Sequence, residues 1–252
     1  MASVMMTSQK RFSNRLLLSL FAGISIFSSS VFAETLLPFK ATFNVRVFGF
    51  NVGEARQSLS CRQQNCLLTS EASPPRWAQR FINESAKEQI HLIQNDHEFK
   101  WLKYKKFLTR RYDDRTEHKT YTLVRDETHK HIHYVEENKN WPLRNLVYDP
   151  ISIAYAIQYR ILNHLPLNNL YLQDDKVQQK IIFSTQNKSD EIDLDFKDEL
   201  QTKRFEFHND KMSIKLWLVP EMAYFPGQIQ VENKIEKRTI TLELNRVPDF
   251  SN

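Results

Sequence analysis

Glycine is scarce in this chain of 252 residues, which contains only four, whereas an average usage of about 7% would give roughly 18. Neither GxGxxG nor GxxxxGK[ST] occurs, so a glycine-rich phosphate cradle is nearly excluded. The patterns Gly-x-Ser-x-Gly, HExxH and the EF-hand loop are also absent. No pair of acidic residues has a spacing that singles it out for acid–base chemistry. We therefore name no catalytic residue, expect no cofactor, and do not expect an enzyme.

No apolar run of membrane-spanning length occurs anywhere in the sequence. The longest runs from Leu16 to Phe27, follows the basic residues Lys10, Arg11 and Arg15, and precedes small residues ending at Ala33. This order is typical of a secretory signal peptide, cleaved here before Glu34. As a helix the run would span about 18 Å, too short for a hydrocarbon core of about 30 Å. We expect a single periplasmic domain over 34–252 without a transmembrane segment, and an uncleaved anchor is the alternative.

A large excess of positive charge is missing once residues 1–33 are removed, because 32 basic residues then face 30 acidic ones. A nearly neutral chain has no strong attraction to nucleic acid, and we expect no such partner. Basic and aromatic side chains nevertheless alternate over 101–115. Contact with anionic lipid headgroups would explain this pattern, but a solvated strand face balanced by acidic residues is favoured. The residues are Trp101, Lys103, Tyr104, Lys105, Lys106, Phe107, Arg110, Arg111, Tyr112 and Arg115, with Glu191, Asp193 and Asp195 as the acids.

The chain has two cysteines, Cys61 and Cys66, separated by four polar residues between two segments of alternating polarity. Export would place them in an oxidising compartment. Opposed residues at the mouth of a hairpin have Cβ atoms about 4.5–5.5 Å apart, which is close to what a disulfide requires. The spacing excludes a catalytic CxxC pair and predicts a Cys61–Cys66 disulfide.

Alternation of apolar and polar residues predicts β-strands over most of the chain. Gly49 to Gly53 interrupts this pattern and predicts a bend or bulge, while 187–189 and 209–210 predict turns. The expected strands are 42–47, 55–61, 66–70, 86–93, 98–108, 117–125, 130–136, 178–186, 190–197, 200–208, 213–219, 227–235 and 239–247.

One long helix is expected over about 149–163, with Asp149 capping it and Pro150 in its first turn. Its apolar residues cover nearly all sides, so several sides should be buried. A second, short helix is expected over about 76–83, where Trp77 and Phe81 recur at helical spacing. We predict a mainly β fold, an antiparallel barrel or half-barrel wrapped on the long helix, with the short helix as a lid.

His129, His131 and His133 raise the question of a metal site, because H-x-H on a strand can bind zinc. With a turn at 126–129, Leu123 opposes Ile132 and Tyr121 opposes Tyr134, so the histidines share the opposite, solvated face. The pattern supplies no acidic or cysteine ligand beside them, and we predict no metal site.

Several short motifs resemble the domain-of-unknown-function 3108 (DUF3108) family of exported bacterial proteins. They are Phe43 with Gly49-Phe50-Asn51-Val52-Gly53, Asp149-Pro150-Ile151-Ser152 with Arg160, and the segment from Ile214 to Pro220 followed by Pro226. The resemblance implies a β-rich, barrel-like envelope protein without known catalytic residues. Glu221 stands where the family would lead us to expect Asp, and the cysteine hairpin is no feature of it.

Three functions are open at this point. The first is a non-catalytic carrier of a hydrophobic, acyl or lipid-like ligand, with an aromatic clamp of Trp77, Phe81, Tyr155 and Tyr159. The second is an interaction or scaffold protein of envelope assembly with a filled core, and the third is an enzyme acting on glycans or lipids. Peripheral membrane contact is compatible with each of them. A cavity above about 300 Å³ would favour the carrier over the scaffold.

Overall fold

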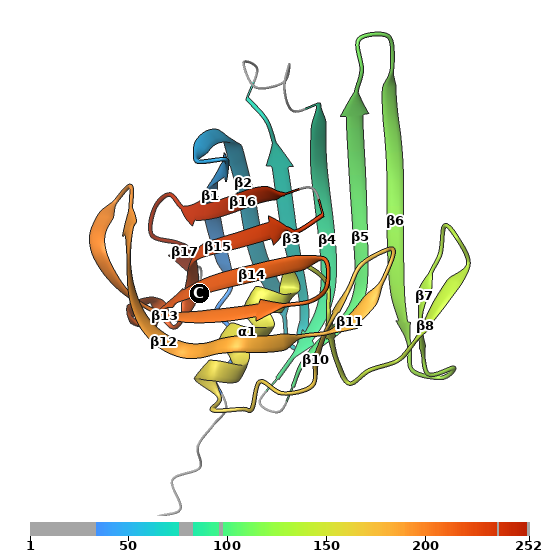
Figure 1. Ribbon diagram of the computed structural model, residues 1–252. Coiled ribbons are helices and arrows are strands. Elements are labelled where there is room, and N and C mark those ends of the chain that lie inside the picture. The colour runs from blue at the N-terminus through green and yellow to red at the C-terminus, as the bar shows by residue number, and fades with distance from the viewer. Residues whose placement is uncertain (1–33, 76–82, 96–97, 236, 251–252) are drawn as a thin grey trace, which may run out of the picture. The chain divides into compact units, whose positions relative to one another are not determined.

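The computed structural model describes residues 34–75, 83–95, 98–235 and 237–250, all within the compact unit Phe32–Asn252. Antiparallel strands dominate this unit (Figure 1). The first nine are β1 (Phe39–Val47), β2 (Phe50–Arg62), β3 (Asn65–Ser73), β4 (Glu84–Gln94), β5 (Phe99–Arg111), β6 (Thr116–Asp126), β7 (His131–Tyr134), β8 (Lys139–Pro142) and β9 (Leu146–Tyr148). After helix α1 (Ser152–Leu162) come β10 (Leu170–Gln173), β11 (Gln178–Lys180), β12 (Ile182–Leu194), β13 (Lys197–His208), β14 (Met212–Val219), the 3₁₀ turn η2 (Pro220–Met222), β15 (Phe225–Asn233), β16 (Arg238–Leu244) and β17 (Asp249–Phe250).

One 14-stranded sheet forms most of the fold, in the order β12-β13-β14-β15-β16-β1-β2-β3-β4-β5-β6-β7-β8, with β17 added beside β1. Its end strands β12 and β8 do not pair with each other, so the sheet is not closed, and the closed barrel among our expectations is wrong. The parallel pair β9–β10 and the antiparallel pair β10–β11 make a separate small sheet. The mainly β, antiparallel prediction is confirmed.

The sheet curves around α1, which lies between β12–β15 on one side and β2–β5 on the other (Figure 1). Ring contacts show this directly: Tyr155 of α1 lies 6.0 Å from Phe225 of β15, and Tyr159 lies 5.6 Å from Phe99 of β5. Every residue from Ser152 to Tyr159 is buried, as an all-round apolar helix requires. No helix among the described residues has the length and apolarity to cross a membrane.

The helix is shorter than predicted, with 11 residues from Ser152 rather than a start near Asp149. The cause lies at its N-terminus, where the buried Asp149 carboxylate accepts the backbone N–H groups of Ile151 and Ser152 at 2.8 and 3.0 Å. The Ser152 hydroxyl also donates to it. Asp149 thus satisfies two of the free N–H groups at the start of the helix, as expected of it, although the N-cap residue itself is Ile151.

Two turn signals have a different outcome from the one predicted. The segment 178–197 was expected to contain two strands, but β12 runs through Asn187, which takes a positive φ of 55° beside register shifts against β13. The turn signal therefore marks an irregularity inside one strand.

At β6–β7 the turn is 127–130, so Leu123 pairs with Tyr134 and Arg125 with Ile132. The predicted pairs are wrong by two residues, which leaves each side chain on its predicted face.

The cysteine hairpin is confirmed. Cys61 and Cys66 are paired across β2 and β3 and form a disulfide with a Cα–Cα distance of 4.1 Å. The expected bulge near Gly53 is present too, because Gly53 faces Val45 while Asn51 faces Arg46, which leaves Val52 as the extra residue.

Candidate functional site

Three parallel rows of side chains cross the face of β2–β5 that looks toward α1. The first row is apolar and large, and consists of Leu59, Leu68, Ile90 and Tyr104. The second, one pleat further from the β2–β3 turn, is polar and consists of Gln57, Ser70, Glu88 and Lys106. The third consists of Ala55, Ala72 and Ala86 and ends at Leu108. We call this third set the alanine row.

The alanine row is less completely covered than the first row, because Ala72 and Ala86 are only partly buried, whereas Ala55 and Leu108 are buried. Its three alanines have short side chains, and α1 contacts the sheet nearer the first row, where Tyr155 stacks on Phe39, the cross-strand partner of Leu59. A depression of about 220 Å³ opens beside Ala72 and Ala86. Its apolar lining also includes Val45, Leu108 and Ile240, with Lys106 at the margin. Glu54 and Glu84 also border it, and each pairs with an arginine, Arg56 and Arg110 respectively. A small, mainly apolar hollow with charged side chains at its margin is suited to a chain-like apolar group with a polar end.

The polar row forms the boundary between the packed and the uncovered parts of this face. Gln57 donates to the Ser70 hydroxyl and accepts a hydrogen bond from the Tyr155 hydroxyl, which ties the row to α1. The Tyr104 hydroxyl donates to Glu88 at 2.6 Å, and the Lys106 ammonium lies 3.9 Å from the same carboxylate oxygen. Burial raises the pKa of Glu88, an effect that Lys106 and Tyr104 partly oppose. Burial, with Glu88 nearby, also raises the pKa of Tyr104, so its hydroxyl stays protonated as a donor.

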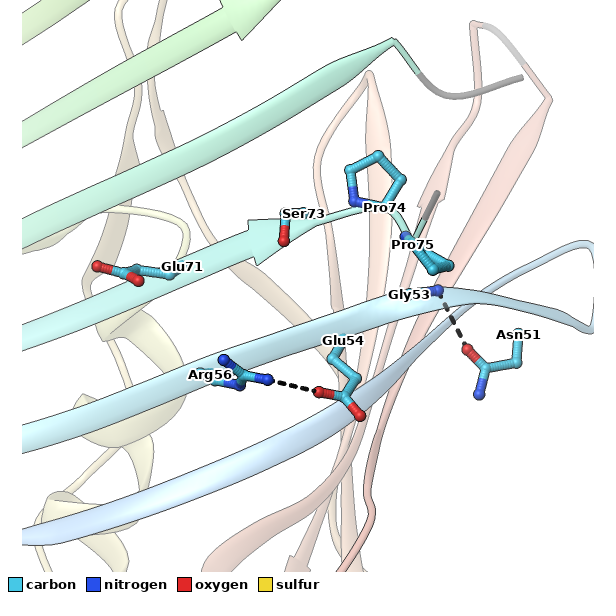
Figure 2. Close-up of a pocket in the computed structure, with 8 residues that line it drawn as sticks. All are labelled: Asn51, Gly53, Glu54, Arg56, Glu71, Ser73, Pro74 and Pro75. Atoms are coloured by element: carbon cyan, nitrogen blue, oxygen red, sulfur yellow. Dashed lines mark hydrogen bonds and ion pairs between the residues drawn. The ribbon is translucent and has the colours of Figure 1, made fainter. Parts of the chain in front are cut away.

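A polar groove of about 520 Å³ adjoins the apolar depression and is drawn in Figure 2. Its lining comes from β2, the end of β3 and the two prolines that follow: Asn51, Gly53, Glu54, Arg56, Glu71, Ser73, Pro74 and Pro75. Glu54 and Arg56 form an ion pair at 3.2 Å on β2, visible as a dashed line in Figure 2. The groove and the depression share Gly53, Glu54, Ser73 and Pro74, so they meet at one point of the sheet.

Gly53 lies very close to the end of β3 and the residues that follow it. A Cβ atom on this residue would lie 2.9 Å from the Ser73 carbonyl oxygen and 3.3 Å from Pro75 Cδ. Real Cβ atoms do not come that close to a backbone oxygen, so the lining keeps this shape because residue 53 has no side chain.

The described half of the predicted aromatic clamp lies in the core. Tyr155 and Tyr159 are each 1% exposed, and their hydroxyls donate to Gln57 and to the Asn95 carbonyl. Tyr155 stacks on Phe39 at 5.1 Å. Tyr159 lies at the edge of a further depression of about 380 Å³, which is also lined by Lys100, Arg125 and Arg160. Trp77 and Phe81, the other half of the clamp, fall outside the described residues, and their meeting with a ligand stays a prediction.

The three histidines lie in and after the β6–β7 turn, with successive ring centroids 5.8 and 6.1 Å apart. Contrary to our expectation, an acid stands beside them: Asp126 lies 2.8 Å from His129 and 3.9 Å from His131. Its carboxylate also accepts the His129 backbone N–H, which with the His129 side chain lowers the pKa of Asp126 to about 2. Within 34–75, 83–95, 98–235 and 237–250, no group of three or more His, Cys, Asp or Glu has an arrangement suited to a metal.

The basic and aromatic segment of β5 is divided between the two faces of the sheet. Trp101 and Tyr104 are buried, whereas Phe107 and Tyr112 are exposed and covered by the cations of Lys105 and Arg115 at 4.7 and 4.6 Å. Neighbouring strands supply the acidic partners: Arg110 pairs with Glu84 at 2.5 Å and Arg115 with Glu117 at 3.1 Å. The acids expected to balance the segment have partners elsewhere. Asp195 pairs with Arg46 at 3.7 Å, Glu191 accepts from Gln201, and Asp193 accepts the Glu199 N–H.

The alanine row could not be identified from the sequence, although all its members lie in segments predicted as strands. Ala55, Ala72 and Ala86 are separated in the chain by different intervals, and only the register of three strand pairs places them side by side. The sequence shows small residues in several strands, but it does not show that they lie side by side. That conclusion requires the register of the strand pairs, which the sequence alone does not provide.

Comparisons with known proteins give a likeness of structure and none of sequence. No family model matches the chain, and no curated protein matches it. Among solved structures, it is similar to the crystal structure of a β-barrel-like protein of domain of unknown function DUF1849 from Brucella abortus. The two chains are 8% identical and superpose with a TM-score of 0.48, over 86% of this chain and 99% of the other.

Proposed function

We propose that the protein is a non-catalytic binding protein of the periplasm that holds a hydrophobic, acyl-type ligand over the alanine row. The observation that carries this proposal is the change along one sheet face, from tightly packed large side chains to two partly buried alanines, Ala72 and Ala86, beside an apolar depression. The ligand's chain would lie on Ala72, Ala86 and Leu108. Its polar end would lie toward Lys106 or the adjoining groove.

The sizes of the two hollows bear on what can bind. Sites for drug-sized ligands usually measure about 300–1,000 Å³. The apolar depression, at about 220 Å³, is below this range, whereas the polar groove that meets it, at about 520 Å³, is within it. A ligand that uses both, with a short apolar segment and a larger polar portion, fits these volumes better than a fully enclosed lipid.

The cellular part of the proposal rests on the sequence of 1–33 and on the disulfide, which is favoured in oxidising compartments. We also propose that the chain is a divergent relative of the DUF3108 family. The motifs behind that resemblance have structural roles here, since Gly49 to Gly53 forms a turn and a bulge and Asp149 caps α1. These structural roles support a fold shared with that family, and they do not assign an activity to the chain.

The proposal is tested with a fluorescent palmitate analogue and two substitutions at one position. Ala72→Leu fills the depression and should weaken binding of this probe by about tenfold, which corresponds to about 1.4 kcal/mol. Ala72→Ser keeps the volume nearly unchanged and should bind within about twofold of wild type. Equal binding by wild type and Ala72→Leu would place the ligand elsewhere.

A filled scaffold is the second candidate, and the packing around α1 favours it. The hollow between α1 and the segment 34–37 has a volume of only about 10 Å³, so this side of the helix has no room for a ligand. If wild-type protein binds no palmitate analogue and the protein purified from its own periplasm contains no lipid by native mass spectrometry, the scaffold function replaces the carrier.

A further inference from the structure

The turn between β1 and β2 carries two phenylalanines into solvent. Phe48 is 67% exposed and Phe50 is 74% exposed, among the largest values for big apolar side chains in the described part of the chain. Between them stands Gly49, around which a Cβ atom would meet nothing within 4 Å. The segment Phe48-Gly49-Phe50 is therefore an open, protruding tip, and these two side chains contribute little to the core.

Turn geometry does not explain the phenylalanine at position 48 either. Phe48 and Gly49 have φ angles of 51° and 83°, the positive pair typical of a two-residue type I′ hairpin. Asn, Asp and Gly are the residues preferred there, and a bulky side chain is disfavoured. Among the other residues with positive φ, Asn138 follows this preference, whereas Gln63, Lys130 and Tyr224 do not. Phe48 is thus unfavourable for the turn and mostly outside the core.

A second apolar tip lies at the same end of the sheet. Ile235, in the turn between β15 and β16, is 70% exposed; Lys234 precedes it in the sequence, and Glu236 and the exposed Lys237 follow it. The Lys234 ammonium donates to the Asn209 carbonyl at 2.9 Å. β16 pairs with both β15 and β1, with Arg238 opposite Asn233 and Ile240 opposite Val47. Both turns therefore project beyond the same ends of three adjacent strands.

We propose that these two turns are a docking surface for a lipid bilayer, with Phe48, Phe50 and Ile235 inserting at the boundary between headgroups and acyl chains. Convex tips with single apolar side chains need no matching hollow, which a fluid membrane surface does not offer and a protein partner would have to provide. Aromatic side chains partition into the interfacial layer, and the exposed Lys237 in the second turn can contact headgroup phosphates. The proposal goes beyond ligand binding and does not require it, although Val45, Val52 and Ile240 connect these strand ends to the apolar depression.

The test is flotation with vesicles of phosphatidylethanolamine and phosphatidylglycerol, using protein whose N-terminus is verified by mass spectrometry to be the same in every variant. Wild type should float with the vesicles. Phe48→Asn and Phe50→Thr should each lower the binding constant by about tenfold, the loss expected for one large apolar side chain. Since Asn is preferred before Gly in this turn, Phe48→Asn should melt at or above the wild-type temperature.

Val247→Asn is the matched control, because Val247 is 57% exposed but follows β16 at the opposite end of that strand from Ile235. It should bind vesicles as wild type does. The proposal is overturned if wild type does not float, if Phe48→Asn floats unchanged, if Val247→Asn loses as much binding as Phe48→Asn, or if Phe48→Asn melts well below wild type. Failure here leaves probe binding by the alanine row unaffected, so the two proposals are separable.

Discussion

The same four strands, β2–β5, build two different surfaces a few residues apart. In the row of Leu59, Leu68, Ile90 and Tyr104 every side chain is buried, and helix α1 packs on that part of the sheet. In the alanine row the side chains are short, Ala72 and Ala86 are only partly buried, and a depression lies over them. Backbone pairing is continuous across both rows. The two rows therefore differ in the size of their side chains and in how closely α1 approaches them. They do not differ in the pairing of the strands.

The sharpest test of this contrast is the same substitution in both surfaces. Leu68→Ala removes a fully buried side chain from the packed row and should lower the free energy of unfolding by about 3–5 kcal/mol. Leu108→Ala removes a side chain that borders the depression and should cost about 2 kcal/mol or less, because its surroundings are already incompletely packed. Urea unfolding curves of the two variants provide the measurement. Equal losses would show that the alanine row is packed as tightly as the core.

How far the sequence anticipates these surfaces depends on the range of the interactions involved. The disulfide and the capping by Asp149 were predicted because each depends on residues at most five positions apart. Strands were predicted because alternation is local, but Asn187 was taken as a turn since the chain alone does not show that β13 continues to pair beyond it. The alanine row depends on strand register, and the predicted register of β6 and β7 differs from the observed one by two residues. Asp126 beside His129 is a local contact, and it was missed because the turn was predicted at 126–129 and lies at 127–130.

Gly53 offers a second way to probe the surface around the depression, because the backbone of Ser73 lies close to this residue. Gly53→Ala would place a Cβ atom 2.9 Å from the Ser73 carbonyl oxygen and should lower the free energy of unfolding by about 2–3 kcal/mol. Gly49→Ala is the matched control, since its Cβ would meet nothing within 4 Å and only the positive φ of 83° opposes it. That variant should cost about 1 kcal/mol. Thermal melts compare the two, and a smaller loss at position 53 than at 49 would contradict the close approach.

The smallest effect is expected at the boundary between the two surfaces, where Glu88 is buried beside Tyr104 and Lys106. Burial raises the pKa of Glu88 above its ordinary value of 4.5. The folded protein therefore holds this proton more tightly than the unfolded chain. Stability from this group is fully present below pH 4.5 and decreases as the pH rises through the raised pKa.

Glu88→Gln removes that pH dependence while keeping an oxygen that can accept the Tyr104 hydroxyl. At neutral pH the variant should melt slightly above wild type, and below the ordinary pKa of a glutamate the difference should disappear. Melting temperatures measured across this pH range provide the check. If wild type is instead the more stable protein at neutral pH, the attraction of Lys106 outweighs burial, and the polar row is an ion-paired support for the depression above it.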